Sequence, residues 1–359
     1  MKAKHYLRSV LVILAFLSIA LTGCQKELND FTGVNPDPNG TSIKVTGALG
    51  TVNCGSAIVN GKYTKGVALN STNTVVLTVN VTSLGAFSVY TPNSNGCSFA
   101  VSGTFTTLGS QSVTLLGTGT PSLNGVASYP VSFAGATSCA FNVVVVKGDP
   151  IYQTSCGTTY VYYEVANQKT LKTWLDRNLG ASQVAQSPID YLAYGSLYQW
   201  GRLSDNHQGI VWEDSYAGTP ITGTTATKSA TDVPGHGNFI TSTSNWRTIF
   251  NNNLWQGTYG VNNPCPLGYR IPTAAEFNAE KATWTAQTPE GAYGSPMKWV
   301  IAGYREGYDG TVTMPGYAGC YWSSTRSSPY ASQLYFDEYG SVVTGELRAN
   351  GCSVRPIKN

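Results

Sequence analysis

The tryptophans of this chain are confined to one part of it. All eight lie at or after Trp174 in a sequence of 359 residues. Because large aromatic side chains are costly to leave exposed, this part of the chain must build an aromatic core of its own. The composition changes at Gly148-Asp149-Pro150, a step with the Gly and Pro typical of a boundary. The sequence therefore predicts two folded units, over residues 42–148 and 149–359.

The first unit shows the two-residue period of β-strands. Leu77, Val79 and Val81 alternate with polar residues, and residues 141–146 have the pattern of a buried strand. Asn-Gly pairs, which favour tight turns, punctuate the strands at positions 60–61, 95–96 and 124–125. We expect an immunoglobulin-like β-sandwich over residues 42–148. It would act as a spacer or, alternatively, as a second binding module.

The N-terminus has the pattern of an export signal. Lys2, Lys4 and Arg8 precede an apolar run at residues 10–20, which is too short for a stable membrane span. Leu21-Thr22-Gly23-Cys24 follows this run and resembles the bacterial lipobox. The resemblance implies cleavage before Cys24 and attachment of lipid to that cysteine. The alternative is an ordinary signal peptide with an incidental cysteine.

Two short segments and a location follow from this pattern. Residues 1–23 are expected to be the signal peptide. Residues 24–41, rich in Asn, Asp, Pro and Gly, are expected to be a lipidated flexible tether. The lipid would hold the exported protein to the outer membrane, at the cell surface.

The charge of the chain argues against nucleic acid as a partner. The formal net charge is +3, from 22 basic and 19 acidic residues. Without the three basic residues of the signal peptide, 19 basic residues remain against 19 acidic ones, and no basic run occurs. The electrostatic pattern of a nucleic-acid-binding protein is therefore missing.

The cysteines favour disulfides over metal binding. If Cys24 carries lipid, seven cysteines remain, so at least one is unpaired or bridges to another chain. No Cys-x-x-Cys motif occurs, and the mature chain has only His207 and His236, which argues against a zinc site. We expect no metal, no cofactor, and disulfides of the kind common in exported proteins.

The second unit has few regular elements. A short helix is expected at residues 194–200, where Leu197 and Trp200 lie three residues apart. Thr273 and Glu276 fit a capping box that begins another helix. The polar segment at residues 205–263 is expected to be a surface insertion made of loops.

A strand near the C-terminus is expected to carry the ligand-binding face. If Leu334 and Phe336 point to the core, then Gln333, Tyr335 and Asp337 point outward, because side chains alternate along a strand. Tyr339 can extend this face, since tyrosine gives contact area at low entropic cost. The alternative is that these tyrosines only cover the edge of the core. Trp322 is expected in the core and Arg355 in a structural hydrogen-bonding role.

The second unit resembles a known family from about Cys156 to Asn359. The resemblance rests on motifs in order: Trp174…Asn178-Leu179, Tyr194-Gly195…Trp200, Cys265-Pro266…Ile271-Pro272-Thr273…Phe277, Tyr321-Trp322-Ser323-Ser324-Thr325 and Ser353-Val354-Arg355. Together they resemble the Fibrobacter succinogenes major paralogous domain. The resemblance implies a C-type-lectin-like α+β fold, related to the formylglycine-generating enzyme scaffold, in exported and surface-attached proteins.

The chain departs from that family at its end. Family members often end in Ser-Val-Arg-Cys, whereas Pro356 stands here in place of the cysteine and Cys352 comes four residues earlier. The resemblance implies that the usual disulfide partner of Cys265 is missing. In the first unit, residues 103–121 resemble sandwich modules common in exported proteins of Bacteroidota.

The ending Ser-Val-Arg-Pro-Ile also resembles that of variable proteins from diversity-generating retroelements, which share the lectin-like fold. The resemblance makes a set of residues before this ending candidate diversified, ligand-binding positions. They are Tyr330, Gln333, Tyr335, Asp337, Tyr339, Arg348 and Asn350, with Cys320 and Cys352 as further candidates. The alternative is a fixed surface.

The residue pattern argues against catalysis. Ser323 and Ser324 have no histidine near them in sequence, as a hydrolase nucleophile would require. Cys320 and Cys352 are expected to form a cross-strand disulfide or to be two buried thiols. Glu306 and Asp309 lie close in sequence, but no Glu-Pro-Asn or Trp-Asn-Asp signature of a calcium-dependent lectin occurs.

The expected function is therefore non-catalytic recognition. The ligand would be a protein or a glycan outside the cell, bound by the C-terminal lectin-like face. The alternative is a structural subunit or tip component of a surface appendage or envelope assembly.

Overall fold

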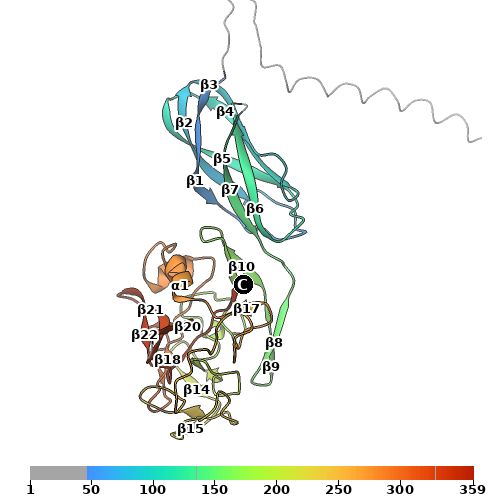
Figure 1. The fold of residues 1–359 in the computed structure, drawn as a ribbon. Helices are drawn as coiled ribbons and strands as arrows, with labels where there is room; N and C mark the ends of the chain where they lie inside the picture. Colours follow the sequence, from blue (N-terminus) through green and yellow to red (C-terminus); the bar gives the residue numbers. More distant parts are fainter. Residues whose placement is uncertain (1–46, 135, 328) are drawn as a thin grey trace, which may run out of the picture.

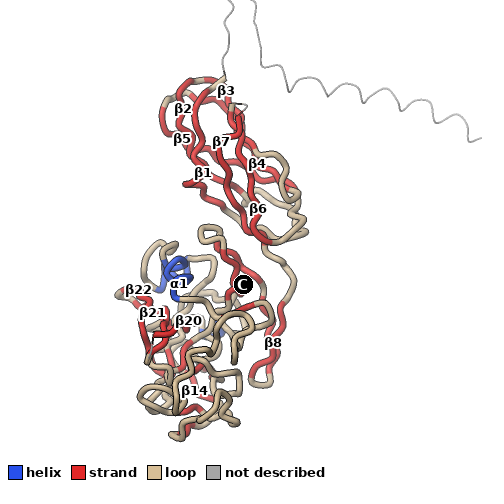
Figure 2. Tube along the Cα trace, in the orientation of Figure 1, coloured by secondary structure: helices blue, strands red, loops and turns tan. Residues whose placement is uncertain are grey.

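The computed structural model describes residues 47–134, 136–327 and 329–359. The protein is mainly β, with 44% strand and 6% helix. The expected signal peptide, the tether and Cys24 lie outside the described residues. Buried side chains form one hydrophobic cluster before residue 148 and three clusters after it. Figure 2 shows long strands in the first part and mostly loops in the second.

The first part is one antiparallel sheet that nearly closes into a barrel. Its strands follow the spatial order β1-β2-β5-β4-β3-β6-β7 (Figure 1). The strands are β1 (Leu49–Val59), β2 (Thr74–Ser83), β3 (Gly85–Tyr90), β4 (Cys97–Phe105), β5 (Gly109–Gly119), β6 (Gly125–Phe133) and β7 (Ala136–Val145).

The expected alternation of buried apolar and more exposed polar residues along a strand is confirmed. Leu77, Val79 and Val81 are buried and pack with aromatic residues such as Phe99. The turn before β4 places Asn95 at φ 50° and Gly96 at φ 78°, the left-handed conformations that an Asn-Gly hairpin turn needs. Local sequence chemistry thus determines both the strands and this turn.

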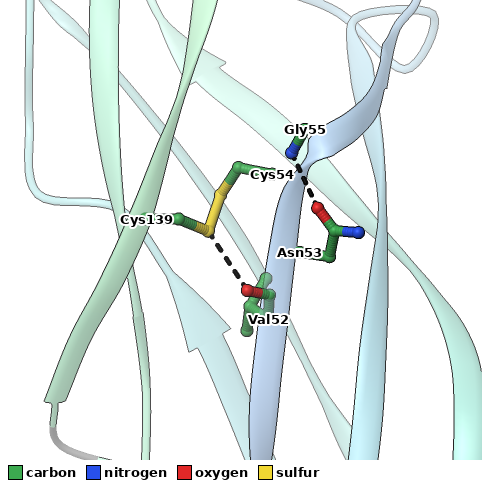
Figure 3. Close-up of a disulfide and its surroundings, with 5 residues drawn as sticks. All are labelled: Val52, Asn53, Cys54, Gly55 and Cys139. Atoms are coloured by element: carbon green, nitrogen blue, oxygen red, sulfur yellow. Dashed lines mark hydrogen bonds between the residues drawn. A yellow bond between two sulfur atoms is a disulfide. The ribbon is translucent and has the colours of Figure 1, made fainter.

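A disulfide joins the two edge strands of the seven-stranded sheet. Cys54 in β1 and Cys139 in β7 are bonded, with their Cα atoms 5.8 Å apart (Figure 3). Among the residues that the structure describes, the two strands share no ladder of hydrogen bonds, so the bridge links the edges where the barrel-like sheet remains open.

The second part consists of short elements held by a large aromatic core. It contains six small sheets with the orders β8-β9, β10-β11-β24-β17, β12-β23-β18-β19, β13-β14, β15-β16 and β20-β21-β22. The strands are β8 (Ile151–Ser155), β9 (Thr158–Tyr162), β10 (Glu164–Asn167), β11 (Lys172–Leu175), β12 (Tyr198–Gln199), β13 (Ile210–Trp212), β14 (Gly218–Pro220), β15 (Thr224–Thr225), β16 (Phe239–Ile240), β17 (Tyr269–Arg270), β18 (Tyr304–Arg305), β19 (Val312–Thr313), β20 (Gly319–Ser327), β21 (Tyr330–Asp337), β22 (Gly340–Glu346), β23 (Gly351–Cys352) and β24 (Ile357–Lys358).

The helices are η1 (Tyr191–Ala193), α1 (Ala274–Lys281) and α2 (Pro289–Gly294). The expected capping box of α1 is confirmed. The Thr273 hydroxyl accepts from the Glu276 amide at 3.2 Å, and the Glu276 carboxylate accepts from the Thr273 amide at 2.9 Å. None of the helices within the described ranges is long and apolar enough to cross a membrane.

Two expectations for the second part are wrong. Residues 194–200 do not form a helix, because η1 ends before them, Gly195 takes φ 73°, and β12 begins at Tyr198. Residues 205–263 are not merely surface loops. They bury Ile240, Trp246 and Trp255 in the core, so tertiary packing overrides the polar composition of this segment.

Candidate functional site

The sheet that carries most of the candidate residues, β20-β21-β22, is packed on both faces. Leu334 and Phe336 lie in one core cluster, as expected from the alternation. Cys320 and Trp322 lie in a second cluster on the other face, together with Tyr198 and Trp200. The segment around β12 and β23 therefore covers much of the face that was expected to be open.

This cover explains the position of Gln333. Its side chain belongs to the second face, but only 3% of the residue is exposed, so the expectation that it points to solvent is wrong. Its Nε2 atom donates to Glu346 Oε2 at 3.2 Å, and its Oε1 atom accepts from the Cys352 thiol at 3.4 Å. Alternation predicts which face a residue belongs to, but not whether another element covers that face.

A cavity of about 80 Å³ remains on this second face. Five of the nine candidate positions line it: Gln333, Tyr335, Asn350, Cys320 and Cys352. Such a volume accommodates a few water-sized groups. The cavity can therefore take a single functional group of a larger ligand.

Three further residues line this cavity that the sequence reasoning missed. They are Tyr304 in β18, Met314 after β19 and Glu346 at the end of β22. They come from separate elements, so no local spacing in the sequence connects them. The only signal for Glu346 is its place on the strand that pairs with β21, where it lies opposite Ala331.

The cavity has an acidic character without a cationic partner. Glu346 accepts hydrogen bonds from neutral donors, the Leu347 amide at 2.6 Å and Asn350 Nδ2 at 3.1 Å. Burial raises the pKa of Glu346, the Leu347 amide opposes that rise, and the charge of Glu306 adds to it. In the described part of the chain, no Lys, Arg or His forms an ion pair with Glu346 or Glu306.

The hairpin tip beside the cavity is held by Asp337. Its Oδ1 atom accepts from the amides of Tyr339 at 2.9 Å and Gly340 at 3.2 Å, and its Oδ2 atom accepts from the Tyr335 hydroxyl at 3.0 Å. Asp337 thus positions both tyrosines. Tyr339 is 88% exposed at the tip. Tyr330 is 43% exposed at the opposite end of β21, roughly 25 Å away along the strand.

Arg348, a candidate ligand-binding position, is buried. It is 1% exposed, so its side chain does not form part of the surface. Its guanidinium lies 4.3 Å from the Trp200 ring centroid and donates to Asn252 Oδ1 at 2.7 Å and to the Tyr330 carbonyl at 3.2 Å. Arg348 therefore fastens the start of β21 to the loop before Trp255.

Asn350 is also buried, but it lines the cavity. Its Oδ1 atom accepts from the Gly307 amide at 2.8 Å. Because its Nδ2 atom donates to Glu346, Asn350 links the turn after β18 to the acidic wall of the cavity.

The two cysteines of the cavity are thiols. The described chain contains the Cys54–Cys139 disulfide, while Cys97, Cys156, Cys265, Cys320 and Cys352 are unbonded. The expected disulfides are thus confirmed for one pair. Cys320 and Cys352 were expected to form either a cross-strand disulfide or two buried thiols, and the structure has two buried thiols. Burial raises the pKa of the Cys352 thiol well above its ordinary value, so its reactive thiolate form is disfavoured at neutral pH.

The hydroxyls of Ser323 and Ser324, the candidate nucleophiles, donate hydrogen bonds to backbone carbonyls. Ser323 Oγ donates to the Ser332 carbonyl at 2.8 Å, and Ser324 Oγ donates to the Pro272 carbonyl at 3.3 Å. Asp309 Oδ1 accepts from the amide and the hydroxyl of Thr311, which makes it a turn residue. Within the described ranges, no group of three or more His, Cys, Asp or Glu is placed to hold a metal ion.

The segment that covers the second face is itself held by a buried histidine. His207 Nε2 accepts from the Gln199 amide at 3.0 Å, and Nδ1 lies 2.6 Å from Asp205 Oδ1. Burial, reinforced by the charge of Arg202, lowers the pKa of His207 to about 4. The imidazole is therefore neutral in the folded protein at neutral pH.

This arrangement predicts a loss of stability in mild acid. The unfolded chain protonates His207 near pH 6.5, but the folded protein does so only near pH 4. The contribution of His207 to stability is therefore constant above pH 6.5 and falls by about 3 kcal/mol between pH 6.5 and 4. Urea unfolding followed by tryptophan fluorescence across this range measures the slope.

The exposed His236 provides the matched control for this titration. His236→Gln should keep the acid-dependent loss, whereas His207→Gln should lower the stability at pH 7 and flatten the slope between pH 6.5 and 4. Equal slopes in the two variants would contradict the assignment.

Comparison of the chain with protein-family models, with curated proteins and with solved structures found no match.

Proposed function

We propose that this chain is an exported, lipid-anchored surface protein that recognises a protein or glycan ligand without catalysis. One observation carries the proposal. The cavity formed by Gln333, Tyr335 and Asn350 holds a carboxylate, Glu346, that no cation of the described chain neutralises. The highly exposed ring of Tyr339 adds contact area at the hairpin tip near this cavity.

The lining residues suggest how such a face engages a ligand. The rings of Tyr304 and Tyr335 and the thioether of Met314 provide an adaptable apolar wall. Glu346 and Asn350 supply oxygen acceptors for hydroxyl, amide or ammonium groups of a ligand. A surface that combines tyrosines with a few fixed polar groups resembles the binding surfaces of antibodies more than the active site of an enzyme.

We also propose the finer fold assignment. The spatial order of the first seven strands is the order obtained when the A-B-E-D and C-F-G sheets of an immunoglobulin domain are joined edge to edge. This order supports an immunoglobulin-like unit over residues 42–148. For residues 149–359 the ordered family motifs support a C-type-lectin-like unit, because Trp322 and Arg355 are both fully buried in it.

Diversification by a retroelement belongs to the same proposal. Five of the nine candidate positions, all within residues 320–352, come from β20, β21 and the segment that enters β23, and they line one cavity. Trp322 packs in the same core cluster as Cys320 and Cys352, so variation at Gln333, Tyr335 and Asn350 would change the ligand at the least cost to that cluster.

The binding face is tested with two exposed or half-exposed tyrosines. The full chain, solubilised in detergent, is applied to arrays of glycans and cell-surface proteins. Tyr335→Ala and Tyr339→Ala should each weaken binding to every hit by about tenfold or more, because each removes one aromatic contact. Tyr152→Ala, an exposed tyrosine in β8, should leave binding unchanged.

The result that would sink the proposed face is a hit that both tyrosine variants bind as tightly as the parent. An array without hits would also count against recognition of these ligand classes.

A structural role is the second candidate, and the free edge of β22 favours it. Among the described elements, β22 pairs with β21 on one side and with no strand on the other. Such an edge can accept a strand from another protein. Chains that polymerise when mixed with an envelope extract, with the edge of β22 protected from hydrogen exchange, would favour assembly over recognition.

A further inference from the structure

The cavity at the C-terminal face has a floor and a rim of different character. Its floor consists of buried side chains, those of Cys320, Gln333, Asn350 and Cys352. Its rim consists of half-buried or exposed side chains, those of Tyr304, Met314, Tyr335 and Glu346. The rim is therefore open to an entering group, and the volume of about 80 Å³ limits that group to a small one.

The Glu346 carboxylate at the rim is held by two side chains that are themselves buried. Asn350 is 5% exposed and donates from Nδ2 to Glu346 Oε1 at 3.1 Å. Gln333 is 3% exposed and donates from Nε2 to Glu346 Oε2 at 3.2 Å. The Leu347 amide also donates to Oε1, at 2.6 Å. Because a carboxylate has about four acceptor positions, one position remains open, on Oε2.

The neighbours of Glu346 add negative charge and no positive charge. The Tyr335 hydroxyl donates to Asp337 Oδ2 at 3.0 Å. Burial, together with the neighbouring Glu306 carboxylate, raises the pKa of the Tyr304 hydroxyl. Both phenols therefore stay protonated at neutral pH, and their oxygens can still accept a hydrogen bond. In the described ranges, no Lys, Arg or His forms an ion pair with Glu306, Asp337 or Glu346.

A primary ammonium group is the cation that fits this cavity. It is compact, it donates three hydrogen bonds, and it carries the charge that Glu346 lacks. A guanidinium is larger and pairs best with both oxygens of a carboxylate at once. That pairing is blocked here, because Leu347 and Asn350 already occupy Oε1. The thioether of Met314 can contact the methylene groups that carry an ammonium in a lysine side chain.

The surface beside the rim favours a protein as the source of this ammonium group. The Tyr317 amide donates to the Met314 carbonyl at 3.1 Å, so Tyr317 lies within one turn of the rim. The rings of Tyr317 and Tyr216 have their centroids 5.5 Å apart, and the two residues are 62% and 55% exposed. Exposed tyrosines of this kind supply the contact area that protein interfaces use.

We propose that the cavity receives a lysine side chain of a partner protein. The lysine ammonium donates to Glu346 Oε2, its methylene groups contact Met314, and the paired rings of Tyr216 and Tyr317 contact the partner's surface around that lysine. This inference rests on the recognition proposed above, and it narrows the ligand to a protein that is anchored by one lysine.

The test titrates the full chain, solubilised in detergent, with Nα-acetyl-lysine N-methylamide and follows binding by ligand-observed NMR. The same compound with an acetylated side-chain amine is the neutral control, and the corresponding arginine compound is the cationic control. The lysine compound should bind saturably. Each control should bind at least about tenfold more weakly, because it loses the charge-assisted hydrogen bond to Glu346 Oε2.

Two variants make the outcome specific to the cavity. Glu346→Gln removes the charge with little change in shape and should weaken binding of the lysine compound by about tenfold. Glu338→Gln is the matched control, since it removes the same charge from an exposed position outside the cavity, and it should leave the affinity unchanged. If Glu346 serves only the fold, Glu346→Gln lowers the urea midpoint and leaves the affinity unchanged, which overturns the proposal.

Three results with the parent chain also overturn the proposal: no saturable binding of the lysine compound, equal binding of its acetylated form, or equal binding of the arginine compound. Failure of this inference and failure of the proposed function are distinguishable. Array hits that bind equally well after acetylation of their lysines uphold recognition and overturn the lysine site. Binding of the lysine compound that depends on Glu346, on a chain without array hits, upholds the lysine site and counts against the ligand classes proposed above.

Discussion

Replacing Arg355 by alanine is expected to lower the stability of the second part of the chain by about 4 kcal/mol. The guanidinium is buried and donates to Asn178 Oδ1 at 2.9 Å and to the Met297 carbonyl at 2.6 Å. It also lies 4.9 Å from the Trp299 ring centroid. The substitution leaves two buried acceptors without donors and opens a cavity beside the ring, and both effects are costly.

Tryptophan fluorescence during urea unfolding measures this loss, because every tryptophan lies in the second part. Arg326→Ala is the matched control, since Arg326 is exposed and its guanidinium donates to the Asn252 carbonyl at 3.3 Å. It should change the stability by less than about 0.5 kcal/mol. A loss below about 1 kcal/mol in Arg355→Ala would show that the guanidinium does not hold these segments together.

Removing the disulfide should have an effect of similar size on the first part. Cys54 and Cys139 are 85 residues apart, so the cross-link excludes many conformations of the unfolded chain. The double variant Cys54→Ala/Cys139→Ala should therefore lose about 4 kcal/mol. The first part has no tryptophan, so the shift should appear in far-ultraviolet circular dichroism and leave the fluorescence transition in place.

Cys97→Ala is the control for this prediction. It removes a buried thiol from the same core but no cross-link, and it should cost about 1 kcal/mol. If the double variant is no less stable than this control, the bridge does not stabilise the sheet.

Local chemistry explains what the sequence predicts correctly. The side chains of Thr273 and Glu276 each accept a hydrogen bond from the other residue's amide, within one turn of helix. Asn95-Gly96 takes the left-handed conformation that its residue types favour. The burial of Leu77, Val79 and Val81 likewise follows from a period of two. None of these features needs information from distant parts of the chain.

The expectations that are wrong share a different cause. Alternation with Leu334 and Phe336 predicts that Gln333 points outward, and the retroelement resemblance makes Arg348 a candidate binding residue. Both are buried, because β23 covers Gln333 while Trp200 and the loop at Asn252 cover Arg348. The cavity between the first sheet and the second part is a stronger case, since the residues that line it run from Val59 to Pro296 and span more than two hundred residues. Single-strand periodicity contains no information about which distant segment packs on a face.

The disulfide also sets how the seven-stranded sheet would respond to a mechanical load. When the two ends of the seven-stranded sheet are pulled apart, tension enters through β1 and leaves through β7, and Cys54–Cys139 joins these two strands covalently. The chain between the cysteines is bypassed and stays folded under tension. Reduction would allow the chain between the two cysteines, which are 85 residues apart, to extend to roughly 290 Å. Under tension the oxidised sheet would keep a fixed length, and the reduced sheet would extend.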